Sequence, residues 1–239
     1  MIDKLLMKLR LRDTLSAAEE DALRALPCSI RRIPKRTTLI RRGEELREST
    51  LLLDGMLGRY KDLRNGSRQI SEVHVAGDFA DLHSFSLKRL DHNVMSFTDC
   101  QVAQVPHERL KAITEQHPHL TRMLWLSTNI DASIHREWVL SLGRRTAISR
   151  VAHFFCELHA RMDVVGVAEP DGFSLELTQM DLAECVGLTP VHVNRTLRAL
   201  REQGLAEFRG GRVTITDMPG LRRVAEFDDM YLYLRSEPR

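Results

Sequence analysis

The sequence lacks any long hydrophobic run. No uninterrupted apolar stretch approaches the roughly 18–20 residues that cross a bilayer, and the first residues, MIDKLLMKLRLRD, have neither the apolar stretch nor the cleavage site of a signal peptide. We therefore expect a cytoplasmic protein that has no membrane partner.

Cysteine and aromatic residues are also scarce. The 4 cysteines lie far apart without a C-x-x-C pair, which argues against a disulfide scaffold and a structural zinc site. They are Cys28, Cys100, Cys156 and Cys185. With 3 tyrosines, 2 tryptophans and 8 phenylalanines in 239 residues, a stacking platform for single-stranded nucleic acid is not expected either.

The chain has little net charge. The 35 Lys+Arg and 33 Asp+Glu leave a formal charge of +2, so any basic surface must be local. With 43% hydrophobic and 28% charged residues, the chain has the composition of an ordinary globular protein, and its length favours two small domains.

Signatures of catalysis are missing too. The chain has no G-x-x-x-x-G-K-[ST], no G-x-G-x-x-G after a strand, no G-x-S-x-G and no H-E-x-x-H, so we predict that it is not an enzyme. His153-x-x-Cys156-x-x-His159 has three-residue steps that carry the outer pair away from one helix face, and we predict no metal site.

The N-terminal half is predicted to be mostly β-structure. A short helix follows Leu15, with Ser16 and Glu19 in capping-box positions, and Pro27 ends it. From about residue 30 to residue 105 the apolar period is two, in short runs separated by glycine turns, which predicts a β-roll. Asn65-Gly66 is predicted to form a two-residue hairpin loop.

A long helix is predicted next. Pro106 opens a helical region, and after His117-Pro118 a helix runs to about Leu142 without internal Gly or Pro. One stripe at steps of three and four residues suits pairing with a second copy, although packing on its own chain is the alternative and both can hold. This predicted dimer stripe consists of Met123, Ser127, Ile130, Ile134 and Trp138. Gly143 followed by Arg144-Arg145 is predicted to be a hinge and domain boundary.

The C-terminal part begins with a helix over residues 147–162. A turn at residues 169–172 is predicted between short strands at residues 164–165 and 173–175.

The stretch from Leu177 to Asp217 fits a helix-turn-helix. A first helix is expected to begin near Thr178 or Gln179, with a turn at Gly187 where positive φ is required. Thr189 then suits the N-cap of a second helix and Pro190 its first position. The run from residue 205 to residue 215 is predicted to be a hairpin that forms a wing.

The second helix presents side chains that can contact DNA. Arginine can bond guanine and asparagine can bond adenine in bidentate fashion, and hydroxyls near a helix start suit phosphates. The predicted DNA contacts are Thr178, Gln179, Thr189, Val191, His192, Asn194, Arg195, Arg198, Arg209 and Arg212. The alternative is a solvated helix face, since five arginines and five acidic residues balance across this stretch. Their segregation favours DNA, with Arg195 as the main guanine reader.

These motifs together resemble the Crp/Fnr superfamily of bacterial transcription regulators. The resemblance covers nearly the whole chain, including Leu52-Leu53-Asp54-Gly55, Ala76-Gly77-Asp78-Phe79 and the stretch Asp181–Thr189. It implies an α+β fold with a cyclic-nucleotide-binding-like β-roll at 1–117, a dimerisation helix and hinge at 118–143, and a winged helix-turn-helix at 144–239. It also implies a homodimer that binds palindromic double-stranded DNA and contacts RNA polymerase.

Departures from the family pattern bear on the effector. Where members that bind cyclic AMP have Gly-Glu and then Arg-Ser or Arg-Thr, this chain has Asp81-Leu82 and Lys88-Arg89-Leu90-Asp91. Such a pocket is electrostatically poor for a phosphate, so we predict no cyclic-nucleotide binding and leave the effector unknown. Cys28 stands alone where iron–sulfur members have a cluster. Haem is a further possibility because four histidines fall in or near the predicted roll, namely His74, His83, His92 and His107. A lone histidine, however, is more often a structural residue than a haem ligand. No cofactor is predicted.

Two further positions leave alternatives open. Val191 stands where many relatives have glutamate, which accepts from cytosine, so the neighbouring base pairs should be read differently. Cys185 allows a redox switch, although a small packing residue is favoured because no adjacent cation would lower its pKa. The rival function is a ligand-binding or protein-interaction β-roll whose C-terminal domain docks a protein.

Overall fold

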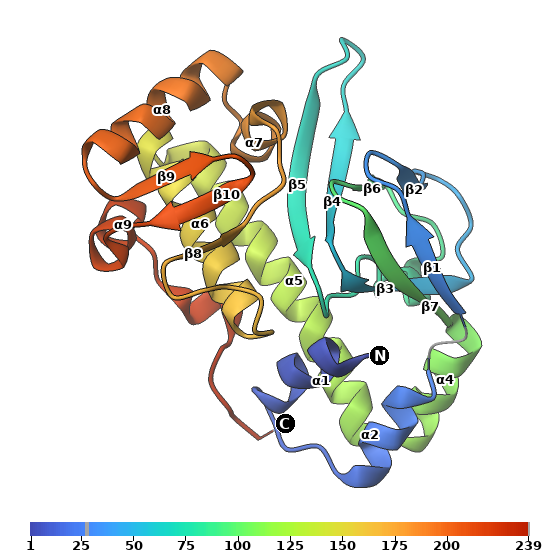
Figure 1. Cartoon of the computed structure of the whole chain (residues 1–239). Coiled ribbons are helices and arrows are strands. Elements are labelled where there is room, and N and C mark those ends of the chain that lie inside the picture. Colours follow the sequence, from blue (N-terminus) through green and yellow to red (C-terminus); the bar gives the residue numbers. More distant parts are fainter. Residues whose placement is uncertain (27–28, 239) are drawn as a thin grey trace. The chain divides into compact units, whose positions relative to one another are not determined.

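The computed structural model describes residues 1–26 and 29–238. Pro27, the predicted end of the first helix, and Cys28 lie outside the described residues. The chain forms two compact units (Figure 1). The first contains residues 1–60, 73–133 and 233–239, and the second contains residues 61–72 and 134–232.

The first unit is built on two antiparallel sheets. One has the order β1-β7-β3, with β1 at Ser29–Ile33, β7 at Cys100–Pro106 and β3 at Glu48–Asp54. The other has the order β2-β6-β4-β5, and its strands are Thr38–Ile40, Asn93–Ser96, Met56–Asp62 and Arg68–Val75. A core that includes Ile33, Leu52, Leu57, Val94 and Val102 fills the roll. The predicted β-roll is therefore confirmed.

Helices of the first unit share a second core. The helices are α1 at Asp3–Arg10, α2 at Ala17–Arg24, α3 at Ser84–Leu87, α4 at His107–Gln116 and the first part of α5. Leu6, Leu23, Leu110 and Leu120 are completely buried in this core. The capping box of α2 forms as predicted, with Ser16 and Glu19 bonded to each other's backbone. Helix α1 was not predicted, because Ile2 at its N-cap makes no side-chain cap, and the leucines of α1 are buried by partners distant in the sequence.

The loop between β4 and β5 differs from the prediction. Leu63 N donates to Ser67 O at 2.8 Å, so three residues, not two, lie between the closing pair. Of these three, Gly66 alone has a positive φ, +84°. The loop is thus a tight turn followed by a left-handed glycine, the geometry of a three-residue hairpin.

Helix α5 spans Pro118–Arg144 and continues through the predicted hinge at Gly143. The chain turns only at Arg145 and Thr146, where the Thr146 hydroxyl accepts from Ser149 N and caps α6, Ala147–Asp163. The N-cap at Thr146 fixes the start of α6, whereas a single glycine lowers helix propensity without ending a helix. The break in the helix thus falls at the last residue of the predicted hinge, Arg145, and not at Gly143.

The predicted dimer stripe lies on the side of α5 that the chain itself covers. Met123, Ile130, Ile134 and Trp138 are buried, and Ser127 is half-buried. Met123 belongs to the helical core of the first unit, while Trp138 packs edge-on against Phe154 in the second. The packing is that of the alternative interpretation, in which the stripe faces its own chain.

The second unit is a small α/β domain. It contains α6, β8 at Gly172–Ser174, α7 at Gln179–Val186, α8 at Pro190–Glu202, β9 at Ala206–Arg209, β10 at Arg212–Ile215, α9 at Met218–Ala225 and the 3₁₀ helix η1 at Asp229–Leu232. The strands form a sheet of order β8-β10-β9. The predicted strand at Val164–Val165 is wrong, because these residues form the turn that ends α6.

A fully buried carboxylate joins three elements of this unit. Glu157 of α6 accepts from Trp138 Nε1 of α5 at 3.1 Å, from Tyr231 Oη of η1 at 2.8 Å and from Arg161 Nη1 at 3.1 Å. Burial still raises its pKa above the ordinary value. Charge-assisted bonds of this kind hold their partners firmly because an unpaired buried carboxylate is unfavourable.

No helix in the described parts of the chain has the length and apolarity to span a membrane.

The buried ring of His153 generates a pH prediction. It stacks on Tyr231 at 5.8 Å between centroids, and burial, assisted by Arg145, lowers its pKa to about 3, although Glu137 Oε1 lies 3.4 Å from Nε2. Below pH 6.5 the unfolded chain takes up a proton on this histidine and the native protein does not. The contribution of the neutral ring to the free energy of unfolding is therefore complete above pH 6.5 and is lost as the pH falls toward 3.

Urea unfolding between pH 6.5 and 5.0 should therefore show the native protein losing about 1.5–2 kcal/mol more than His153→Gln. His117→Gln, at the half-buried junction of α4 and α5, is the control. Parallel stability curves for the native protein and His153→Gln would contradict this assignment.

Candidate nucleic-acid interface

The first helix of the predicted helix-turn-helix begins at a double cap. Asp181 N donates to Thr178 Oγ1 at 3.1 Å, and Thr178 N donates to Asp181 Oδ2 at 2.7 Å. This reciprocal pair satisfies amides that the first turn of α7 would leave unbonded. The predicted start near Thr178 or Gln179 is confirmed. The Thr178 hydroxyl is therefore already committed to the cap.

The turn between α7 and α8 has the predicted geometry. Gly187 closes α7 at φ +61°, and a Cβ there would lie 2.8 Å from Leu142 Cδ2. Leu188 N then donates to Ala183 O at 3.0 Å. Thr189 caps α8 by accepting from His192 N at 3.3 Å, and Pro190 occupies the first helical position. The left-handed backbone conformation favours glycine at 187, and a larger residue would also displace the end of the Leu142 side chain.

Helix α8 separates an inner from an outer face. Val193, Leu197 and Leu200 are buried, and Thr196 is buried beside them. On the outer face Asn194 and Arg195 are exposed, while His192 is half-buried. No acidic residue lies in the first turn of α8, so the positive end of the helix dipole is left for an anion.

The predicted arginines differ in what they contact. Arg198 Nε donates to Glu202 Oε1 at 2.6 Å along the exposed side of α8. Arg212 donates to both carboxylate oxygens of Glu169, at 3.2 and 2.7 Å, and also lies 3.3 Å from Asp171 Oδ1. Arg195 has no ion-pair partner among the residues described here. Arg195 is consequently the most available of the three for a base or phosphate.

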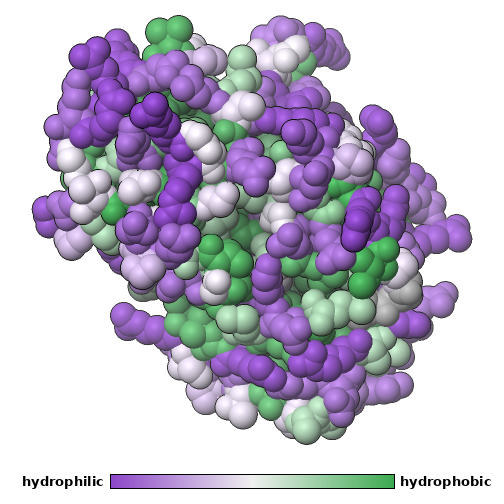
Figure 2. Space-filling view, in the orientation of Figure 1, coloured by the Kyte–Doolittle hydropathy of each residue, from purple (hydrophilic) through white to green (hydrophobic). Residues whose placement is uncertain are grey.

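The predicted wing is confirmed as a hairpin. Strands β9 and β10 pair from Ala206↔Ile215 to Arg209↔Arg212, with the turn at Gly210-Gly211. Arg209 is exposed beside this turn, whereas Arg212 is held by the turn that precedes β8. Thr178, Gln179 and Thr189 are also exposed. Figure 2 shows a mainly hydrophilic surface over α7–α9, with isolated apolar groups.

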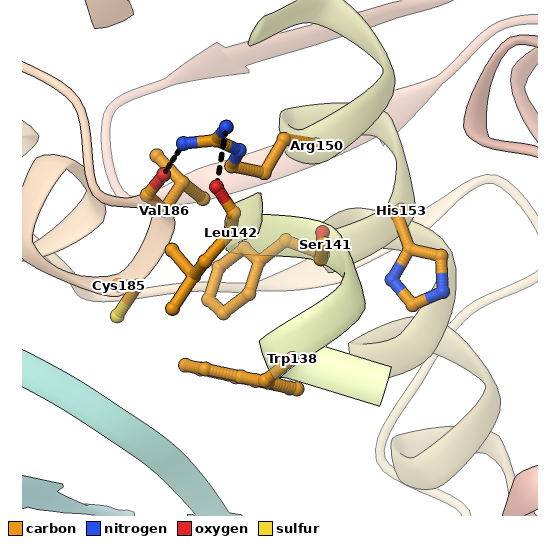
Figure 3. A pocket seen from close by; sticks show the side chains of 8 residues that line it. Trp138, Ser141, Leu142, Arg150, His153, Cys185 and Val186 are labelled. Atoms are coloured by element: carbon orange, nitrogen blue, oxygen red, sulfur yellow. Dashed lines mark hydrogen bonds between the residues drawn. The ribbon is translucent and has the colours of Figure 1, made fainter. Parts of the chain in front are cut away.

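Sequence reasoning missed the side chain that holds the turn in place. Arg150 of α6 donates through Nη1 to Val186 O at 2.8 Å and to Gly187 O at 3.4 Å. Through Nη2 it donates to Leu142 O at 3.0 Å and to Arg145 O at 3.1 Å. One planar guanidinium thus joins the end of α5 to the end of α7 (Figure 3).

Arg150 lies at the edge of a small pocket in the second unit. Trp138, Ser141, Phe154 and Cys185 line the pocket with it, and the hollow is about 10 Å³ (Figure 3). The Cys185 thiol is completely buried, and burial together with Asp181 and Glu184 raises its pKa well above the ordinary value. These surroundings favour a packing role for Cys185 over a reactive thiolate.

A second contact on α7 comes from the hairpin segment of the same unit. Gln69 Nε2 donates to Glu184 O at 2.6 Å and lies 3.4 Å from Cys185 O. These carbonyls belong to the last turn of α7, where no intrahelical donor remains. The spacing of residues along the sequence contained no indication of this bond.

The position that the resemblance assigns to a ligand is occupied by a closed polar network in the first unit. Asp81 is buried and accepts from Thr50 N at 2.5 Å, and burial raises its pKa to about 7. Arg59, which the sequence analysis did not single out, is 4% exposed and bonds Ala80 O at 3.0 Å and Asp131 Oδ2 at 3.2 Å. The roll thus contains a buried arginine, Arg59, but this arginine is paired with Asp131 of the same chain.

The histidines considered for haem also have partners. His107 Nε2 lies 3.1 Å from Ser84 Oγ and 3.3 Å from Ser49 Oγ, and His92 Nδ1 lies 2.9 Å from Asp91 Oδ1. His74 is buried, and His83 lies 3.9 Å from Asp131. In the second unit, His159 Nε2 bonds Glu169 O at 3.0 Å and His153 stacks on Tyr231.

Replacing Arg150 tests its role in holding the turn. Arg150→Met removes the donor for four carbonyls, and we expect urea unfolding to show a loss of about 2–4 kcal/mol. Arg198→Met, which removes only an exposed pair, is the matched control and should change stability by less than about 1 kcal/mol. Equal effects of the two substitutions would argue against the role of Arg150.

Two segments of the sequence match known domain families. Residues 30–117 match the cyclic nucleotide-binding domain, and residues 149–224 match the Crp-like helix-turn-helix domain. The curated relatives include the fumarate and nitrate reduction regulatory protein of Escherichia coli K12, 24% identical over 212 residues, 89% of this chain and 84% of that protein. The transcriptional activator protein FnrA of Stutzerimonas stutzeri is 26% identical over 89% of this chain and 86% of its own.

Solved structures agree with these matches. FixK2 from Bradyrhizobium japonicum has a TM-score of 0.75 and 25% identity, covering 82% of this chain and 96% of that one. The regulator CLP of Xanthomonas campestris, described as responsive to c-di-GMP, shares the fold at a TM-score of 0.66 and 18% identity, over 84% of this chain and 100% of its own. With its β-roll, long helix and capped helix-turn-helix, the chain belongs to the Crp/Fnr superfamily of transcription regulators and carries a DNA-binding helix-turn-helix domain.

Proposed function

We propose that this regulator binds a two-fold symmetric operator as a homodimer and places α8 of each protomer in the major groove. The observation that carries the proposal is the division of α8, whose inner face is buried while Asn194 and Arg195 are exposed in its N-terminal half. In helix-turn-helix proteins this end of the second helix meets the base edges. Arg195 would bond guanine, and Asn194 would bond adenine.

Backbone contacts would set the register of the protein on DNA. The first turn of α8 contains no acidic residue, so the positive end of its dipole is suited to a phosphate, as are the exposed side chains of Gln179, Thr189 and Arg209. Arg198 and Arg212 can join them by exchanging a carboxylate partner for a phosphate. Exposed ion pairs are weak enough for this exchange.

The dimer contact of this proposal lies on the exposed side of α5, opposite the covered stripe. Trp125 is 66% exposed and Val139 is 71% exposed. Exposed positions recur at alternating steps of four and three residues, the repeat of a two-helix seam. The exposed seam consists of Trp125, Asn129, Ala132, Arg136, Val139 and Gly143. Two α8 helices held by such a pair would need to lie about 34–36 Å apart.

The effector is proposed not to be a cyclic nucleotide. Asp81 is a buried acid, which disfavours a phosphate beside it. The guanidinium of Arg59 is already paired with Asp131. Contact with RNA polymerase remains part of the proposal through the family, one member of which is named a transcriptional activator.

Selection of bound duplexes from a random DNA pool tests the operator. The native protein should enrich a palindrome that contains a guanine in each half-site, and Arg195→Ala should weaken binding to it by about 5- to 150-fold. Arg223→Ala, an exposed residue of α9, is the control. Affinity should also fall steeply with salt, because phosphate contacts release counterions. Absence of enrichment and of salt dependence would favour the alternative of a protein-docking domain.

Sedimentation equilibrium tests the exposed seam. Val139→Asp places a charge in the seam, so the variant should sediment as a monomer at concentrations where the native protein is a dimer, and its operator affinity should fall. Met230→Asp, at a residue 75% exposed in the same unit, should stay dimeric. A dimeric Val139→Asp would exclude this seam.

A further inference from the structure

Val191 is the most exposed of the large hydrophobic residues in the described chain, with 80% of its surface accessible. It occupies the second position of α8, directly after Pro190. The buried side chains of this helix are Val193, Thr196, Leu197 and Leu200, so the core does not use Val191.

A valine at this position is unfavourable for the isolated helix. β-Branched residues have low helix propensity, and the first turn favours acidic side chains. The surface around α8 is mainly hydrophilic (Figure 2). An apolar side chain that stabilises neither the helix nor the core is best explained by a contact made in the complex.

Helix geometry places Val191 next to the proposed base readers. Residues three and four positions apart are neighbours on a helix surface, so Val191 adjoins both Asn194 and Arg195. All three are exposed. A valine therefore faces the base pairs beside those that these two residues would contact.

The chemistry of the major groove identifies what a valine can read. Its side chain has no donor or acceptor, and among the four bases thymine alone presents a methyl group in that groove. We propose that Val191 determines specificity by packing on the 5-methyl group of a thymine next to the guanine that Arg195 bonds. This inference rests on the proposed function.

Substitution in the DNA isolates the methyl group. In the palindrome selected by the native protein, thymines within two base pairs of the Arg195-dependent guanine are replaced one at a time by deoxyuridine, which lacks only that methyl. At one position the native protein should bind about three- to fivefold more weakly, the effect of losing one buried methyl group. Deoxyuridine outside the half-site is the control.

Substitution in the protein assigns the effect to Val191. Val191→Ala should bind the thymine and deoxyuridine duplexes equally, because its side chain is too short to reach the methyl. Val191→Glu should select cytosine at that position, since a carboxylate accepts from cytosine N4. Both variants change an exposed side chain, so their unfolding midpoints should match that of the native protein.

The outcomes separate this inference from the proposed function. A palindrome that depends on Arg195 but shows no difference between thymine and deoxyuridine would overturn the role of Val191 and leave operator binding intact. A deoxyuridine effect that persists in Val191→Ala would assign the methyl contact to another residue. Failure to enrich any palindrome would overturn the proposed function, and the role of Val191 with it.

Discussion

The carbonyl groups at the end of α7 impose the constraint on which the DNA-binding unit depends. A helix must end at Gly187 so that α8 can begin three residues later, and the last carbonyls of the ending helix then need donors. Arg150 supplies them to Val186 and Gly187, and the same guanidinium bonds Leu142 and Arg145 at the end of α5. Gln69 supplies a further donor to Glu184. The direction of α8 is thereby coupled to the end of the long helix.

The second unit also contains a buried network of polar side chains around Glu157, apart from the turn between α7 and α8. Glu157 joins α5, α6 and η1 through bonds to Trp138, Arg161 and Tyr231. Buried ionic groups of this kind add geometric definition more reliably than net stability. Helix α6, which carries both Glu157 and Arg150, packs against α8, so that the outer side chains of α8 are presented from a well-supported helix. A reader of base edges needs such support because a small displacement breaks bidentate bonds.

Helix α5 shows how one element serves two surfaces. Its covered stripe, with Met123, Ile130 and Trp138, packs into the chain, while exposed positions on the other side repeat at the spacing of a helix pair. The covered stripe has apolar residues at steps of three and four, and the exposed seam has them at steps of seven, at Trp125, Ala132 and Val139. Periodicity alone identifies an apolar stripe, but it does not state which partner covers it.

The sequence by itself determined the features of this protein that depend on local interactions. The caps at Ser16 and Thr189, the start of α7 near Thr178, the turn at Gly187 and the wing hairpin depend on residues within a few positions of one another, and all form as predicted. Tertiary structure decided the features that depend on distant residues. It formed α1 by burying its leucines, extended α5 through Gly143, paired Arg59 with Asp131 and engaged Arg150 and Gln69 at α7. The physical reason is that caps and turns are satisfied within one or two helical turns, whereas burial and long-range hydrogen bonds require partners that only the folded chain brings together.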